Sequence, residues 1–260
     1  MSAYLPPQHG AWAFLGLPLA LGLTQATWTP WLLVLAVAWI AAFPLSYAAL
    51  ALVRSRRAPR LRERFRRPFA VWLLVVLPCV LALLVARPWL LWVGMAYVAL
   101  FAVNVVYARR GDERALANDL AFIAECSAMV AVVWGVGATP EGGWAWPFAE
   151  APQHVWVLVA FCALVLAGST LHVKSLIRER ADPRYARASV LFAWGSLAAS
   201  VGLAVWWGLP TGWWLVVPFT FLAARAHLIP GRGLRPAVIG LVELAAFVLA
   251  AVSALLARPL

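Results

Sequence analysis

Two carboxylates and several amides lie inside stretches of this chain that are otherwise almost entirely apolar. Glu125 and Glu243 each fall about two turns into such a stretch, and His172 lies near the end of another. Asn118 and Glu125 are spaced i, i+7, so they share one face of a helix. Polar side chains are costly within a bilayer, which predicts an internal polar cavity that Asn104 and His172 also face. The alternative is that both carboxyl groups are protonated or paired and serve only helix packing. The residues expected to carry chemistry are Asn104, Asn118, Asp119 and Glu125.

An acidic turn precedes the stretch that contains Glu125. Asp112, Glu113 and Asp119 form the densest group of carboxylates in the chain. Together with Asn118 they offer the oxygen ligands that Mg²⁺ prefers, so these three carboxylates are the predicted metal ligands. The alternative is that the charges of this turn are simply solvated.

A basic segment follows the stretch that contains His172. Lys174 and Arg178 are spaced i, i+4 and therefore share a helical face, while Arg180 joins them if the helix ends before Pro183. Glu179 can pair with a neighbouring arginine and hold the segment in shape. Arginine forks suit a phosphate or carboxylate, so we predict that His172, Lys174, Arg178, Glu179 and Arg180 bind an anionic group. The alternative is that the basic residues only anchor the helix end to anionic lipid.

The elements that position these residues are apolar runs of about 20 residues, long enough to cross a bilayer. The sequence predicts nine transmembrane helices, over 10–26, 30–53, 68–86, 88–107, 116–138, 153–174, 187–208, 210–229 and 236–257. Of the 21 basic residues, all but Arg87 and Arg258 fall in or beside the loops after the even-numbered runs. This positive-inside pattern places the N-terminus inside and the C-terminus outside. Ten tryptophans fall at the outer ends of runs, as in an interfacial belt: Trp28, Trp31, Trp89, Trp92, Trp144, Trp146, Trp206, Trp207, Trp213 and Trp214.

The composition indicates one membrane-embedded domain over residues 1–260. Hydrophobic residues make up 65% of the chain and charged residues 12%, about half the charged share of a soluble domain. The net charge of +11 would suggest nucleic acid in a soluble protein, but here it follows from topology, and no nucleic acid partner is expected. The predicted partners are the lipid bilayer and an amphiphilic small molecule.

Three segments resemble motifs of the bacterial YwiC-like membrane protein family. Residues 7–13 read PQHGAWA, like the opening motif of that family. Asn104 with 111–114 (GDER) and 118–119 (ND), and residues 174–180 (KSLIRER), resemble its inner-loop motifs. The resemblance covers most of the chain and implies a bacterial inner (plasma) membrane protein. It also draws attention to Gln8 and His9, which we expect to bind a ligand headgroup.

The layout is also similar to that of the UbiA-type intramembrane prenyltransferases. These have nine helices, an inner-facing cavity, and motif-bearing inner loops after the second and sixth spans. The resemblance implies a transferase acting on a prenyl phosphate-like or other lipid substrate. The departure is that aspartate-rich, Mg²⁺-binding motifs are replaced here by basic segments, with only Glu63 in the first loop and Glu179 and Asp182 in the second.

The sequence therefore predicts an all-α, polytopic helical bundle with a cytoplasm-facing polar pocket for an amphiphilic anion, and a transferase is the favoured class. Mg²⁺ is the one cofactor that the sequence suggests. Two alternatives remain open. The chain could be a transporter or exporter, or a non-catalytic membrane factor whose charged loops bind a soluble partner.

Overall fold

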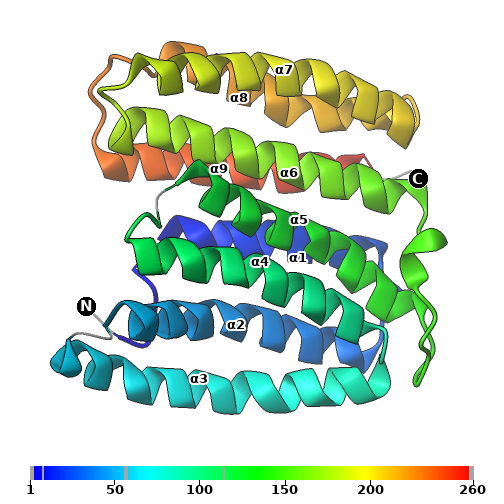
Figure 1. Cartoon of the computed structure of the whole chain (residues 1–260). Coiled ribbons are helices and arrows are strands. Elements are labelled where there is room, and N and C mark those ends of the chain that lie inside the picture. The colour runs from blue at the N-terminus through cyan, green and yellow to red at the C-terminus, as the bar shows by residue number, and fades with distance from the viewer. Residues whose placement is uncertain (1–2, 8, 56–57, 114, 258–260) are drawn as a thin grey trace.

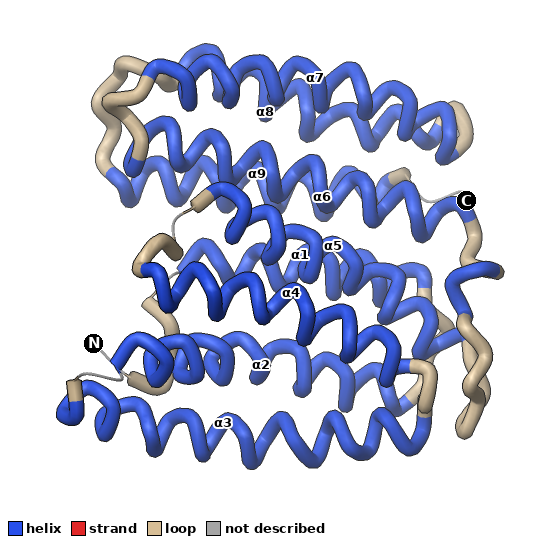
Figure 2. The backbone as a smooth tube through the Cα atoms, in the orientation of Figure 1, coloured by secondary structure: helices blue, strands red, loops and turns tan. Residues whose placement is uncertain are grey.

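The computed structural model describes residues 3–7, 9–55, 58–113 and 115–257. All regular secondary structure in these residues is helical, and they form no strand (Figure 2). Its helices are α1 (His9–Gln25), α2 (Pro30–Arg54), α3 (Pro59–Ala86), α4 (Leu90–Arg110), α5 (Leu116–Ala138), α6 (Gln153–Val173), α7 (Pro183–Trp207), α8 (Val217–Leu228) and α9 (Pro236–Leu256). Short η elements are η2 (Pro147–Ala149), η3 (Lys174–Arg178) and η4 (Thr211–Val216). The all-helical prediction is confirmed.

The helices run roughly side by side and their loops gather at two ends of the bundle (Figures 1 and 2). In the centre α1 packs against α5, α6 and α9, and α5 packs against α4 and α6. On one side α6 leads to α7 and α8, while on the other side α2 and α3 pack together at the edge. The N- and C-terminal ends of the chain lie at opposite ends of the bundle (Figure 1).

Proline and glycine mark several of the helix boundaries. A proline opens each of α2, α3, α7 and α9, where its missing N–H and fixed φ cost nothing. Gly111 ends α4 with a φ of +73°, a left-handed conformation that glycine adopts without strain. Except at the start of α3, these signals lie within four residues of the run boundaries that the sequence predicts.

The bundle is built for a lipid environment. Within the described part of the chain, seven helices are long and apolar enough to cross a membrane, counting the extension of α6 to Arg178, and the apolar segment Gly10–Gln25 is shorter. The eighth predicted run, 210–229, begins with the 3₁₀ turn η4, so that the α-helix α8 has only 12 residues. Large apolar side chains are exposed along the helices, for example Leu74 at 73% and Val85 at 79%. Exposed apolar surface on this scale is what a bilayer covers.

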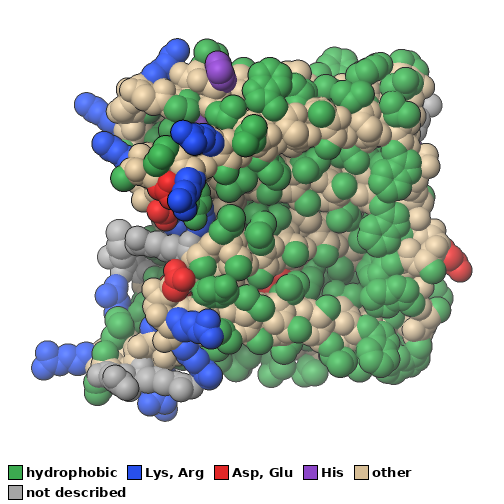
Figure 3. Space-filling view, turned by 45° about the horizontal axis from the view of Figure 1, so that its top comes forward, with side chains coloured by type: hydrophobic (Ala, Val, Ile, Leu, Met, Phe, Trp, Pro, Cys, Tyr) green, Lys and Arg blue, Asp and Glu red, His purple; other side chains and the backbone are tan. Residues whose placement is uncertain are grey.

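Two basic stretches differ from the prediction. Arg60 to Arg67 were expected in a loop, but they form the first turns of α3, which begins at Pro59 rather than near residue 68. Arg225 was expected at the inner end of the eighth run, beside the loop that follows it, but in α8 it is only 4% exposed. Even so, Figure 3 shows that the visible Lys and Arg side chains gather at one end of the molecule.

The opposite end is closed by the segment 139–152 and its neighbours. Trp31 Nε1 donates to Glu141 at 2.6 Å, and the backbone N–H of Gly142 donates to Ala86 at 2.9 Å. Seven of the ten tryptophans predicted for this end are at least 45% exposed, as an interfacial belt requires. Trp89 and Trp207 are instead buried and use their indole N–H groups to bond Thr139 and Ala257. These two tryptophans therefore close the end of the bundle from within.

Candidate functional site

A π-turn at the basic end of α6 brings a lysine into the bundle. The five residues of η3, Lys174–Arg178, are wound as a π-helix, and the N–H of Glu179 closes the turn on the carbonyl of Lys174 at 2.8 Å. Single π-turns occur frequently at functional sites. Lys174 is 2% exposed, and its Nζ lies 2.7 Å from an Asp119 carboxylate oxygen in the first turn of α5. Arg178 is close enough to interact electrostatically with the same carboxylate. Lys174 is buried and Arg178 is exposed, so the shared face that the spacing suggests stays a prediction.

A second ion pair extends this cluster toward α2. Arg54, the last residue of α2, pairs with Glu113 in the turn before α5. Asn118 donates from Nδ2 to the backbone carbonyl of Glu113 at 2.9 Å, and its Oδ1 is buried without a hydrogen-bond partner among the described residues. The ends of α2, α5 and α6 at the basic end of the bundle are thus linked by alternating charges. We call Arg54, Glu113, Asn118, Asp119 and Lys174 the α5–α6 cluster.

A separate buried ion pair joins the last helices. Arg225 of α8 pairs with Glu243 of α9, and the hydroxyl of Ser169 on α6 donates to the other Glu243 oxygen. The side chains of Arg225 and Glu243 are 3% and 8% exposed. A buried carboxylate that has both a cationic and a hydroxyl partner holds three helices in a fixed relation.

His172 lies one turn from Ser169 on α6 and is 1% exposed. Its Nδ1 is 3.5 Å from the hydroxyl of Ser189 on α7, and its Nε2 has no hydrogen-bond partner among the described residues. His172 also interacts electrostatically with Arg225. We call Ser169, His172, Ser189, Arg225 and Glu243 the α6–α9 cluster.

The residues that were predicted to face one cavity have different partners in the structure. His172 belongs to the α6–α9 cluster and Asn118 to the α5–α6 cluster. Asn104 of α4 is 8% exposed and donates to the carbonyl of Leu100 in its own helix at 3.4 Å. Glu125 has a buried oxygen without a hydrogen-bond partner among the described residues, and its backbone carbonyl accepts from the Tyr97 hydroxyl at 3.0 Å.

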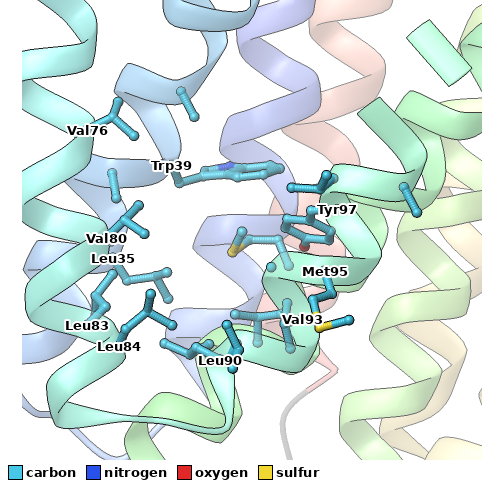
Figure 4. Close-up of a pocket in the computed structure, with 18 of the residues that line it drawn as sticks. Leu35, Trp39, Val76, Val80, Leu83, Leu84, Leu90, Val93, Met95 and Tyr97 are labelled. Atoms are coloured by element: carbon cyan, nitrogen blue, oxygen red, sulfur yellow. The ribbon is translucent and has the colours of Figure 1, made fainter. Parts of the chain in front are cut away.

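An apolar groove lies on the α2–α4 side of the bundle. It has a volume of about 600 Å³ and lies between α2, α3, α4 and the middle of α5. Figure 4 shows Trp39 of α2 and Tyr97 of α4 at one end of it, and their ring centroids are 6.1 Å apart. Tyr97 therefore separates the groove from the Glu125 backbone.

The predicted Mg²⁺ ligands are not brought together. Glu113 is paired with Arg54 and Asp119 with Lys174, while Asp112 is exposed on the turn. Among the described residues no three His, Cys, Asp or Glu side chains are grouped as a metal site. Two of the three predicted ligands are therefore paired with cationic side chains.

The remaining predicted ligand-binding residues lie at or near the basic end. Arg180 is exposed on the turn that follows η3, and Glu179 lies beside it, partly buried. His9 begins α1. Gln8 lies outside the described residues.

Sequence reasoning missed the partner of Glu243. Arg225 falls inside the eighth predicted run and Glu243 inside the ninth. Opposite charges in two successive apolar runs could have indicated that the two residues form an ion pair. Ser169 and Ser189 carry no such signal, because serine is common inside membrane helices.

Comparison with known proteins places the chain in a family. The YwiC-like protein family model matches residues 5–134. The uncharacterized protein YwiC of Bacillus subtilis is 30% identical over 253 residues, which cover 94% of this chain and 93% of the relative. An uncharacterized protein of Haemophilus influenzae is 25% identical over 248 residues, covering 94% of each chain. No solved structure matches. This chain is therefore a multi-pass integral membrane protein that belongs to the YwiC-like family.

Proposed function

We propose that the protein crosses the plasma membrane nine times, with its N-terminus in the cytoplasm, and binds the headgroup of an amphiphilic anion at its inner end. The two chain ends lie at opposite ends of the bundle, which fits an odd number of spans (Figure 1). The basic side chains gather at the N-terminal end (Figure 3), which fits the retention of Lys and Arg in the cytoplasm.

The π-turn of α6 is the observation that carries the proposed ligand site. Asp119 neutralises the buried Lys174 and holds the turn against α5. Arg178 and Arg180 are exposed at the end of this fixed turn, and their guanidinium groups supply the excess positive charge. A planar fork that is held in position suits a bidentate phosphate or carboxylate.

The rest of the bundle supports an amphiphile rather than a soluble anion. The site lies where apolar spans meet the inner surface, so the apolar part of a ligand can remain among the helices or in the bilayer. The apolar groove between α2, α3 and α4 adds a surface of this kind.

Transfer of a group to or from such a lipid is the reaction class that we favour, in an arrangement of spans like that of the UbiA-type enzymes. Transport would need access from both sides of the membrane. Here the outer end is packed by Trp89, Arg87 and the segment 139–152, with Arg87 Nε donating to the Val136 carbonyl at 3.2 Å. The polar clusters are near the inner end, which favours access from one side.

Exchange of arginine for lysine tests the proposed site. In a strain that lacks the gene, the Arg178→Lys/Arg180→Lys variant should fail to reverse the phenotype of the deletion, because lysine retains the charge but cannot form the bidentate contact. Arg184→Lys/Arg187→Lys, a matched exposed pair on the first turns of α7, should complement fully. The abundance of each variant in the membrane fraction is measured in parallel. Full complementation by the first variant would show that these residues only anchor a helix end.

A further inference from the structure

The first turns of α3 carry three arginines on one face. Arg60, Arg64 and Arg67 are spaced i, i+4 and i+7 and are all exposed. They line a hollow of about 590 Å³ together with Ala3 and Tyr4 of the N-terminal segment and with Glu63 and Pro68 of α3. The three guanidinium groups outnumber the single Glu63 carboxylate, which also lies 3.7 Å from Arg66. This hollow lies on a different helix from the α6 site and contains none of its residues.

The N-terminal segment is fixed against α3 just where the apolar part of the helix begins. Trp72 donates from Nε1 to the backbone carbonyl of Tyr4 at 2.8 Å. Tyrosine and tryptophan favour the headgroup level of a bilayer, so the bond marks the membrane interface. The three arginines are on the water side of that level.

The arginine face of α3 continues as an exposed apolar stripe. Val71, Leu74, Leu81 and Val85 follow Arg67 at helical spacing and are 44%, 73%, 54% and 79% exposed. From Arg67 to Leu81 the helix rises about 21 Å, at 1.5 Å per residue. That is longer than one leaflet of hydrocarbon, which is about 15 Å thick. One surface therefore offers cations, interfacial aromatic groups and a track of acyl-chain length, in that order.

We propose that this hollow binds the phosphate of an anionic phospholipid, whose acyl chains lie along the exposed stripe of α3. Arginine forks bind phosphate oxygens in pairs, and clustered basic residues beside a membrane helix bind anionic lipid. Phosphatidylcholine, with its compensating choline charge, fits the three arginines less well. Under the proposed topology this phospholipid lies in the cytoplasmic leaflet. That placement rests on the proposed function, while the binding itself does not.

Native mass spectrometry of the detergent-purified full-length protein tests this site, with phosphatidylglycerol, phosphatidylcholine and inorganic phosphate as probes. Arg64→Gln/Arg67→Gln should weaken phosphatidylglycerol binding about 30-fold, the loss expected for two basic side chains near an anionic lipid surface. Arg62→Gln/Arg184→Gln is the matched control, because these two exposed arginines do not line the hollow and it removes the same net charge. The control should bind phosphatidylglycerol as the wild type does.

Three results would overturn the inference. Equal losses in the two double variants would show attraction by net charge alone. Equal binding of phosphatidylcholine and phosphatidylglycerol by the wild type would exclude recognition of the anionic headgroup. Retention of inorganic phosphate at the same concentration as lipid would assign the hollow to a soluble anion. All four arginines are exposed, and an unchanged thermal midpoint without added lipid verifies that each variant is folded. If the Arg64→Gln/Arg67→Gln variant does not fold, Arg60→Gln replaces it, with an expected loss of about fivefold.

Discussion

The pair between Arg225 and Glu243 is the interaction whose loss should weaken the bundle most clearly. The two side chains join α8 to α9 and are 3% and 8% exposed. In Glu243→Gln the guanidinium stays buried, while its counter-charge is replaced by a neutral amide of nearly the same shape. The perturbation is therefore electrostatic rather than steric.

The magnitude follows from the burial of the pair. Breaking a buried ion pair by removing one partner costs about 3–5 kcal/mol, because the remaining charge is uncompensated. For a chain of this size, each kcal/mol lowers the thermal midpoint by about 2–4 °C. Glu243→Gln should therefore unfold roughly 6–20 °C below the wild type. Arg225→Met/Glu243→Met should recover most of this loss, since replacing both charges by apolar groups is close to neutral.

Thermal unfolding in a non-ionic detergent, monitored by the fluorescence of the 16 tryptophans, measures these shifts of the midpoint. Glu63→Gln is the control, because Glu63 and Arg66 are 3.7 Å apart on α3 and their side chains are 69% and 73% exposed. Its loss should stay below about 1 kcal/mol. The reasoning is refuted if Glu243→Gln shifts the midpoint no more than Glu63→Gln does. It is also refuted if the double methionine variant is as unstable as the single variant.

Three other predictions concern the α5–α6 cluster, helix packing and topology. Lys174→Met should lower the abundance of the protein in the membrane, because it leaves the Asp119 carboxylate without its lysine partner. Lys174→Met/Asp119→Asn should restore the abundance but not the complementation of a deletion strain. Restored complementation would assign the pair to packing alone. Gly212→Ala should lower the thermal midpoint by several degrees, because the added Cβ would lie 2.1 Å from a backbone oxygen of α7. In Gly202→Ala the added Cβ meets no atom within 4 Å, so this control should be neutral or stabilising. Equal midpoints of the two variants would contradict this packing. Glu150→Cys should react with an impermeant maleimide in intact cells, and labelling only after permeabilisation would place this loop inside.

Helix boundaries could be predicted where a strong local signal brackets an apolar run. The fifth run was placed over 116–138 and α5 spans Leu116–Ala138, because Gly111 and the acidic turn precede it. The start of α3 was missed by nine residues, because five arginines within 60–67 resemble a solvated loop, although Pro59 is a good first helical residue.

The candidate site could be predicted only in part. Lys174 and Arg178 were recognised as neighbours because their relation is local. The pairing of Lys174 with Asp119 depends on how α5 packs against α6, and no local pattern encodes that. The pairing of Arg225 with Glu243 likewise depends on how α8 packs against α9, which no local pattern encodes. Long-range pairing thus turned predicted metal ligands into partners of nearby cations.

The most direct test of the central claim is to identify what copurifies with the protein. Native mass spectrometry of the wild type, extracted from its own membrane, should show an amphiphilic anion whose binding is lost in Arg178→Lys/Arg180→Lys and retained in Arg64→Gln/Arg67→Gln. The second variant separates this ligand from the phospholipid expected on α3. A ligand that both variants retain equally, or a wild type that carries no anionic amphiphile, would contradict the proposed function.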